Sequence, residues 1–450
     1  MRIFNLIFFF TVSWTFSQET VITVDGEKLA LMDDFSFISQ FDSILVGNGE
    51  FGGILTIVDY DSLKGALLNY EVQNNHKTID EIIFNKKMGI NTPVLQQMFS
   101  NLTNAHSFES AKTIVNEMRT GFPFIPKNLH LTYGLMKNDG LGVLVNFEPE
   151  FNSHFSGIAG AGRQDDRGWD IAGEIDIHLE NTWQTANMTD LIWKRNGEES
   201  QYILFRHEEP YLAGLPFGAK FELVQDLRNR EYIHTRSSGA FSLQLGRRGK
   251  WYFGGGKESI KPTALGDSLW INPFEVRTFN VEYFSDGRND RWLPTNGFFL
   301  NMKSQTGIEN SSNQNDNLVV RLQFYIEEFL SFSERVALRF KFWNGIVLDS
   351  EEHISQKIRY GGMNTFRGYQ EDIFASNFIN IISLDVLFTP TEQFQLFTFG
   401  DKAIPTNPMS LGLGLRQRKA NSVMEVSFGW PVDEAFSAGK VHVKFTSLLD

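Results

Sequence analysis

A glycine-rich segment and a cluster of ionisable residues are the first candidates for bond chemistry. Gly254-Gly255-Gly256-Lys257 is similar to the end of a phosphate-binding loop, but Glu258 stands where that loop has Ser or Thr, and Trp251 stands where it has glycine. His207-Glu208-Glu209 has the residue types of a metal site. It lies in an alternating segment, however, so neighbouring side chains point to opposite faces and cannot chelate one ion together. We expect neither phosphate-loop nor metal chemistry here.

The sequence also lacks the other common catalytic signatures. It contains no cysteine, which excludes a thiol nucleophile and Cys-ligated metals, and it has no Gly-x-Ser-x-Gly element of a hydrolase. Asp176, His178 and Glu180 share one face of an alternating segment, where we interpret them as polar lining. We therefore predict no enzyme, no cofactor and no metal. An outer-membrane lipase or protease stays open only if an unrecognised acid/base pair lies in the interior.

Charge and the N-terminal segment indicate where the chain works. It has 41 Lys and Arg against 54 Asp and Glu, a net charge of −13, which argues against nucleic acid as a partner. Arg2 precedes an apolar run from Ile3 to Val12, and small residues follow at Thr15 and Ser17. This pattern predicts a signal peptide over residues 1–17. The alternative, a membrane anchor, is disfavoured because the run is too short to span about 30 Å.

Two regions with different hydrophobic patterns follow the signal peptide. Residues 72–150 predict the order β-α-α-β-β: a strand at Ile79–Ile83, two helices that begin near Thr92 and Ser107, and two final strands. Residues 18–71 read as an incomplete segment that precedes this module. The helices must pack on one face of a small sheet, so we expect an α+β domain.

From residue 151 to 450 apolar and polar residues alternate in segment after segment. Trp169–Glu180, Val320–Glu327 and Leu338–Phe342 are examples. The alternation persists for about 9–14 residues, the length of a tilted strand that crosses a bilayer with apolar residues toward lipid and polar residues toward a wet lumen. A soluble β-sandwich, the alternative, has shorter strands on average. We predict an all-β transmembrane β-barrel of about sixteen antiparallel strands, an even number as in bacterial outer-membrane barrels.

Three short motifs lie at the ends of these predicted strands. A long connection before the fifth strand from the end contains Gly361-Gly362 and then Phe366-Arg367-Gly368-Tyr369. Phe399-Gly400-Asp401-Lys402-Ala403 lies in a following strand, and Pro294-Thr295-Asn296-Gly297 precedes a middle strand. Together with the β-α-α-β-β module, these motifs resemble the outer-membrane assembly and secretion superfamily. This superfamily includes BamA, TamA, the two-partner secretion transporters and the bacterial surface antigen proteins. Ala403 replaces a glycine of the family pattern.

The resemblance implies a domain plan and a site. Residues 18–71 would be a truncated polypeptide-transport-associated (POTRA) segment, 72–150 a POTRA-like periplasmic domain, and 151–450 the barrel. The long loop would fold into the lumen, where its arginine meets an acidic residue on the wall. Strand parity turns Phe399 and Asp401 inward, so Arg367 would bind Asp401, and Asp385 is a second inward candidate. The lumen-loop residues are Gly361, Gly362, Phe366, Arg367, Gly368 and Tyr369.

The resemblance also implies a function without bond chemistry. Such a barrel would lie in the bacterial outer membrane with its N-terminal part in the periplasm, and would insert or translocate unfolded or partly folded polypeptide that the POTRA-like domain captures. Its expected partners are outer-membrane lipids, the polypeptide substrate, and periplasmic chaperones or lipoproteins. The alternative is a passive outer-membrane pore or surface protein that keeps this barrel and transports no protein.

Overall fold

The computed structural model describes most of the chain after residue 76. The described residues are 22–24, 27–29, 51, 54–61, 67–73, 77–85, 88–136, 140–164, 168–196, 200–244, 249–271, 273–310, 317–348 and 356–449. The predicted signal peptide, 1–17, lies outside them. Among the described residues, no helix is both long and apolar enough to cross a membrane.

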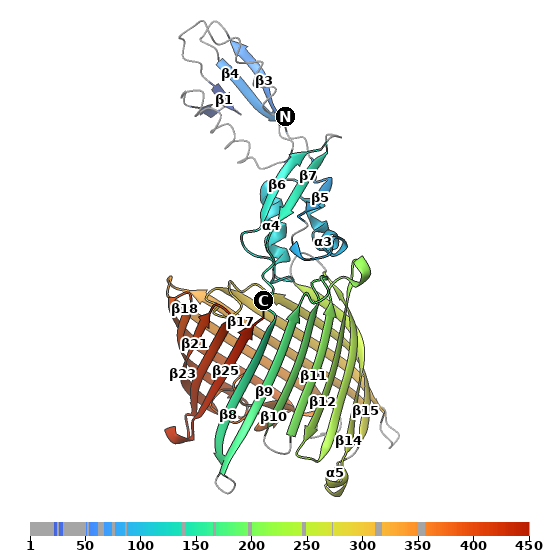
Figure 1. Cartoon of the computed structure of the whole chain (residues 1–450), viewed down its shortest axis with the longest axis vertical. Coiled ribbons are helices and arrows are strands. Elements are labelled where there is room, and N and C mark those ends of the chain that lie inside the picture. Colours follow the sequence, from blue (N-terminus) through green and yellow to red (C-terminus); the bar gives the residue numbers. More distant parts are fainter. Residues whose placement is uncertain are drawn as a thin grey trace. The chain divides into compact units, whose positions relative to one another are not determined.

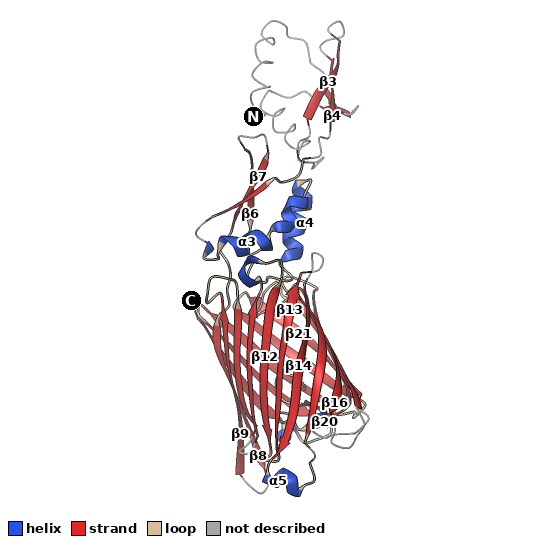
Figure 2. Cartoon of the chain, turned by 90° about the vertical axis from the view of Figure 1, so that its right-hand side faces the viewer, coloured by secondary structure: helices blue, strands red, loops and turns tan. Residues whose placement is uncertain are grey.

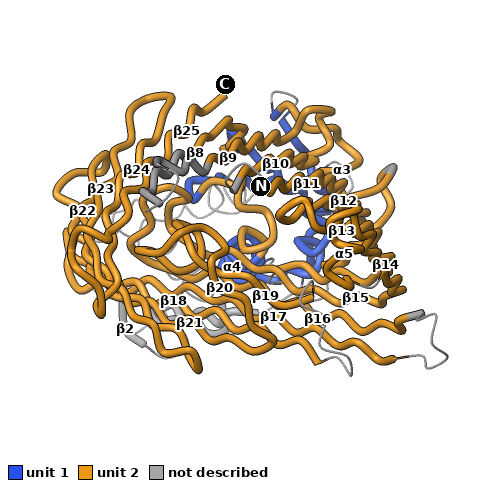
Figure 3. The backbone as a smooth tube through the Cα atoms, turned by 90° about the horizontal axis from the view of Figure 1, so that it is seen from below, with its two compact units in different colours: residues 1–88, 98–117, 127–148 blue, residues 89–97, 118–126, 149–450 orange. Residues whose placement is uncertain are grey.

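The chain divides into two compact units, coloured separately in Figure 3: residues 1–88, 98–117 and 127–148, and residues 89–97, 118–126 and 149–450. The first unit holds two sheets, with strand orders β2-β1-β4-β3 and β5-β7-β6. Its strands are β1 (Ile22–Val24), β2 (Glu27–Leu29), β3 (Ile54–Asp61), β4 (Leu67–Gln73), β5 (Glu81–Phe84), β6 (His130–Leu135) and β7 (Leu141–Asn146).

Two helices separate β5 from β6, so the predicted β-α-α-β-β order is present. They are α3 (Thr92–Met98) and α4 (Phe108–Met118), shown in blue in Figure 2. Helix α4 begins directly after Ser107, whose side-chain oxygen accepts a hydrogen bond from the backbone N–H of Ser110 at 3.0 Å. This is an N-cap contact. The helix buries Ala111 and Ile114 at helical spacing.

Sixteen described strands of the second unit close into one antiparallel barrel, as predicted (Figure 1). They are β8 (His154–Gln164), β9 (Gly168–Glu180), β10 (Met188–Asn196), β11 (Ser200–Glu209), β12 (Gly218–Arg228), β13 (Tyr232–Leu243), β14 (Lys250–Pro262), β15 (Phe274–Asp286), β16 (Gly297–Asn310), β17 (Asn317–Ser331), β18 (Val336–Leu348), β21 (Phe378–Thr391), β22 (Phe394–Ile404), β23 (Met409–Lys419), β24 (Ser422–Pro431) and β25 (Lys440–Leu448). The last strand, β25, pairs with the first, β8, from Val441↔Ala161 to Leu448↔His154 and closes the barrel.

Because neighbouring strands are antiparallel, their connections alternate between two ends of the barrel. One end, here the α5 end, carries the short helix α5 (Ala264–Ser268) and the 349–377 connection. The other, the C-terminal end, carries the start of β8, the end of β25 and the 287–296 connection. At the C-terminal end, the backbone N–H of Gly249 donates to Thr120 Oγ1 at 2.9 Å, and the backbone N–H of Asp286 donates to the Thr120 carbonyl at 2.8 Å. Residues 118–126 therefore lie against the barrel rim.

Candidate functional site

The lumen loop, defined here as residues 349–377, is built around a small hairpin that turns back into the barrel. Its described part, 356–377, pairs β19 (Ile358–Tyr360) with β20 (Phe374–Ser376). The ring of Tyr360 stacks on Phe374, with ring centroids 5.0 Å apart, and Phe366 stacks on Tyr369 at 4.8 Å. Tyr360 and Phe366 are fully buried against wall residues Ile379, Ile381 and Ala403. The aromatic residues thus fix the loop to strands β21 and β22.

Glycine is required where the loop reverses direction. Gly361 has a φ of +131°, and a Cβ atom there would lie 2.3 Å from the carbonyl oxygen of Gln370. The Thr365 hydroxyl donates to the Gly361 carbonyl at 2.6 Å and so closes the turn. A side chain at Gly361 would push the two arms of the loop apart.

Arg367 lies at the centre of the site, with only 3 % of its surface exposed. Its Nε and Nη2 donate to Asp401 at 2.9 and 2.6 Å, and its Nη1 and Nη2 donate to Asp385 at 3.1 and 2.7 Å. Its backbone N–H also donates to Asp401, and its guanidinium carbon lies 3.7 Å from the ring centre of Phe399. One planar cation therefore holds two buried carboxylates and an aromatic face, an arrangement that a lysine cannot copy.

The structure thus brings together the loop arginine and all three wall residues that the sequence singled out, with Asp385 as a full partner. Gly361, Gly362, Phe366, Gly368 and Tyr369 form the turn and the aromatic stack around it. The carboxylates face inward because β21 and β22 alternate, and Asp385 lies opposite Phe399 in their register.

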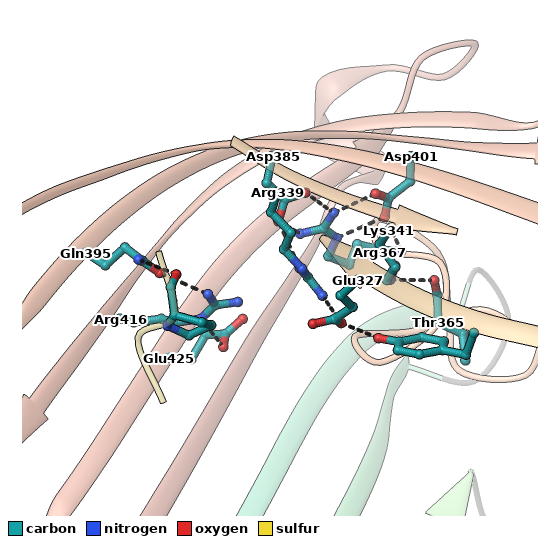
Figure 4. A network of polar contacts seen from close by, with 12 residues as sticks. Glu327, Arg339, Lys341, Thr365, Arg367, Asp385, Gln395, Asp401, Arg416 and Glu425 are labelled. Atoms are coloured by element: carbon teal, nitrogen blue, oxygen red, sulfur yellow. Dashed lines mark hydrogen bonds and ion pairs between the residues drawn. The ribbon is translucent and has the colours of Figure 1, made fainter. Parts of the chain in front are cut away.

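Further charged residues, which the motif comparison missed, extend this network (Figure 4). Arg339 on β18 donates to Asp385 at 2.9 Å and to Glu327 on β17 at 2.6 Å. Lys341 donates to the Thr365 carbonyl at 3.2 Å. In the sequence, the only indication of these residues is that each is a polar residue in an alternating strand, which predicts that its side chain faces the lumen. Only the pairing Arg339↔Asp385 across two strands shows that they belong to the site.

A second set of contacts holds the other side of the lumen loop to strands β9, β10 and β12. Asn364 donates to Glu174 at 3.4 Å, and Arg228 pairs with Asp372 at 2.9 Å. Lys194 lies 2.7 Å from Glu174 and 4.0 Å from Glu371. Glu371 lies in the loop and outside the barrel strands. Its burial is the main reason that its pKa is raised to about 7, and Asp372 and Glu174 raise it further while Lys194 opposes them. The loop therefore bridges two sides of the wall.

The 287–296 connection, which we name the strap, makes contacts to several strands at the C-terminal end. Arg291 pairs with Glu180 on β9 at 2.7 Å, and Asp290 pairs with Arg418 on β23 at 2.7 Å. The indole N–H of Trp292 donates to Asn152 at 3.2 Å. Glu180 lies on β9, Asn152 lies just before β8, and Arg418 lies on β23, so the strap ties together the two sides of the β25–β8 closure.

The candidates for bond chemistry lie elsewhere in the barrel wall. Glu208 is buried and accepts hydrogen bonds from Lys250 and Tyr252 at 3.0 Å, whereas His207 contacts the ring of Trp183. His178 lies between Asp190 at 2.6 Å and Glu180 at 3.0 Å. Within the described ranges, no group of three or more His, Cys, Asp or Glu residues is arranged to hold a metal ion.

Comparisons with known proteins agree with this geometry. Residues 271–392 match the Omp85 superfamily domain, a range that includes the strap and the lumen loop. Among solved structures, the chain is similar to CdiB from Escherichia coli (10% identity, 98% of this chain and 93% of that one, TM-score 0.56) and to CdiB from Acinetobacter baumannii (10%, 96% and 89%, 0.54). It is also similar to BamA from Haemophilus ducreyi lacking POTRA domains 1–3 (13%, 94% and 94%, 0.50).

No curated protein sequence matches the chain. The identities to the solved structures are low, so these likenesses speak for the fold. The family match over residues 271–392 confirms the resemblance predicted from the motifs, and the sixteen-stranded barrel has the fold of BamA and CdiB.

Proposed function

We propose that the chain is an integral protein of the bacterial outer membrane that inserts polypeptides into that membrane or translocates them across it. The observation that carries the proposal is the lumen loop, which is anchored by Arg367 to Asp385 and Asp401 inside an Omp85-type barrel. The ion pairs of the site hold the loop against the wall, and we propose a role without bond chemistry.

The N-terminal module is the proposed capture site, located in the periplasm. Strand β6 lies at an edge of the described β5-β7-β6 sheet. An extended polypeptide can add to such an edge through backbone hydrogen bonds, which read little of its sequence. We orient the barrel by the rule that the longer connections of outer-membrane barrels lie on the extracellular side. The 349–377 connection is at the α5 end, so this end would face the outside and the C-terminal end the periplasm.

The test compares the full chain with a variant that lacks residues 72–150, both reconstituted into phospholipid vesicles with a chemically unfolded outer-membrane barrel polypeptide. Substrate insertion is read by its heat-modifiable gel shift and translocation by protection from protease. We expect the deletion to lower the yield at least tenfold, while the variant itself keeps its own gel shift. A passive pore would instead conduct ions in both forms and raise substrate yield in neither.

A further inference from the structure

The outer face of strands β13, β14 and β15 can be assigned from burial. Phe241 and Phe279 are 59 % and 57 % exposed, whereas Tyr232, Ile260 and Val276 are buried. Because side chains alternate along a strand, the odd-numbered residues of all three strands point outward. On the half nearest the C-terminal end these outward residues are apolar apart from Ser285 near the rim, as expected for contact with lipid.

Toward the α5 end the outward residues become mainly polar, while the inward side carries apolar residues beside the buried His234 and Glu258. The inward side carries the apolar cluster of Tyr232, Ile260, Phe274, Val276 and Val319. The outward side carries polar and charged residues, which we name the outer polar patch: Thr235, Ser237, Lys257, Ser259, Lys261 and Arg277. In the strand order these strands lie half-way round the barrel from the β25–β8 closure. The patch is therefore separate from the lumen site and from that closure.

The charges of the outer polar patch are arranged as a cation-rich cluster. Lys257 and Arg277 lie directly opposite each other on β14 and β15, a position where like charges repel. Glu275 pairs with Lys257 at 2.6 Å. Three cations and one carboxylate leave an excess of two positive charges, and the Lys257 side chain is 56 % exposed.

Charged side chains on the lipid face of a barrel are costly in hydrocarbon and tolerated at its edge. The last outward aromatic residue on β15 is Phe279, and Arg277 follows two residues closer to the α5 end. The outward residues of β15 therefore change from apolar to charged between Phe279 and Arg277, and we place the hydrocarbon boundary of this wall there, with lipid headgroups level with Lys257 and Arg277. Phosphate is the headgroup component that a guanidinium binds through paired hydrogen bonds.

We propose that the outer polar patch of β13–β15 binds the phosphate groups of lipid headgroups in the leaflet at the α5 end. The inference requires a membrane-spanning barrel but no polypeptide transport, so it stands or falls separately from the proposed function. Lys257 and Arg277 hold the phosphate between two strands, and Lys261 lies four residues further out on the same face of β14, beyond Ser259. The bound lipid would hold the membrane thin along this wall.

The binding test uses the full chain in dodecylmaltoside micelles, with bound lipid counted by native mass spectrometry. Dioleoyl phosphatidic acid is titrated in parallel with dioleoyl phosphatidylcholine, which has the same acyl chains. We expect phosphatidic acid to bind at least tenfold more tightly. The triple variant Lys257→Gln, Lys261→Gln, Arg277→Gln should lose that preference. A control variant, Lys402→Gln, Lys419→Gln, which removes two cations from the outer face of β22 and β23, should keep it.

Three results would overturn the proposal. The first is equal binding of the two lipids by the unmodified chain, and the second is an unchanged preference for phosphatidic acid in the triple variant. The third is complete displacement of phosphatidic acid by 10 mM inorganic phosphate, which would indicate a site for free anions. The unmodified chain supplies the first and third results even if the triple variant fails to fold.

A depth measurement checks the boundary without removing the cation pair. The chain has no cysteine, so Phe279→Cys and Lys261→Cys each provide a single site for a nitroxide label. In vesicles of phosphatidylcholine and phosphatidic acid at 3:1, the label at 279 should be relaxed mainly by oxygen and the label at 261 mainly by an aqueous nickel complex. Two labels with the oxygen-dominated behaviour of hydrocarbon would contradict the proposed boundary.

Discussion

Replacement of Arg367 by alanine should release the lumen loop from the wall. The substitution removes four side-chain hydrogen bonds and leaves Asp401 buried without its guanidinium partner. Asp385 keeps Arg339 at 2.9 Å, which limits the loss. Removal of one partner of a buried ion pair costs about 3–5 kcal/mol, and the retained Arg339 contact favours the lower part of that range. At about 1.4 kcal/mol per factor of ten, the undocked loop should become roughly 100- to 1,000-fold more populated.

The assay uses the absence of cysteine from the chain. Met363 is buried in the docked loop, so a Met363→Cys thiol reacts with a maleimide only when the loop leaves the wall. If opening is fast relative to labelling, the labelling rate reports the undocked fraction. Arg367→Ala should therefore speed labelling toward the rate of a free thiol. The matched control is Arg359→Ala, which removes a loop arginine whose described contact is a 3.5 Å approach to the Tyr232 hydroxyl.

A double-mutant cycle separates the ion pair from general damage. Asp401→Asn should also speed labelling. In the double variant with Arg367→Ala, the free energy of loop docking should fall by less than the sum of the two single changes, because both changes remove the same interaction. Additive effects would refute the reasoning, as would an Arg367→Ala rate within threefold of the Arg359→Ala control.

Three further predictions concern other residues of the lumen loop and a partner of the strap. Because the pKa of Glu371 is raised to about 7, its carboxyl is protonated in the docked loop at low pH. The loop should be held most firmly below about pH 5 and loosen as the pH rises through about 7. Channel openings in planar bilayers should then be more frequent at pH 8.5 than at pH 5.5, and Glu371→Gln should abolish this difference. Gly361→Ala should raise maleimide labelling at position 363 at least tenfold because its Cβ would meet the Gln370 carbonyl at 2.3 Å; labelling at the unmodified rate would show that the turn adapts. Arg418→Ala removes a partly exposed partner of Asp290, so we expect a loss of at most about 1 kcal/mol, seen as a gel-shift transition only a few degrees lower; a collapse of the barrel would show that the strap carries far more.

The barrel was predictable because its signal is local. Each strand lies between two different environments, so apolar and polar residues must alternate, and segments such as Leu338–Phe342 show this within a few residues. The alternation of side chains along the strand then predicted that Asp401 faces the interior. The aromatic stack of Phe366 on Tyr369 follows from the same motif that carried the family resemblance.

What the sequence could not provide was register across the lumen loop. Arg339 and Asp385 become opposite neighbours only when β18 pairs with β21, and the strands are separated by 29 residues of connection, 349–377. The sequence also did not predict how many carboxylates bind Arg367, because that number depends on the same strand register. Because Asp385 also binds it, exchanging Arg367 and Asp401 would place two carboxylates together, so a simple charge swap is not expected to restore the site.

The outer polar patch shows a second limit of alternation. The alternating pattern shows that the two faces of a strand differ in polarity. It does not show which face contacts lipid at each height along the barrel axis. The expectation that apolar residues point outward is therefore wrong at several positions in the α5-side halves of β13–β15, where the buried Tyr232 and Ile260 face inward and Lys257 faces outward.

The most direct test of the central claim places a photo-reactive benzoyl-phenylalanine at Thr132, on the edge strand β6, in the full chain produced in growing cells. The matched position is Glu109 on α4, which is also exposed. If the chain handles polypeptide through this edge, irradiation should yield protease-sensitive adducts of higher mass at Thr132 and not at Glu109. Equal labelling at both positions, or no polypeptide adduct at Thr132, would contradict the account.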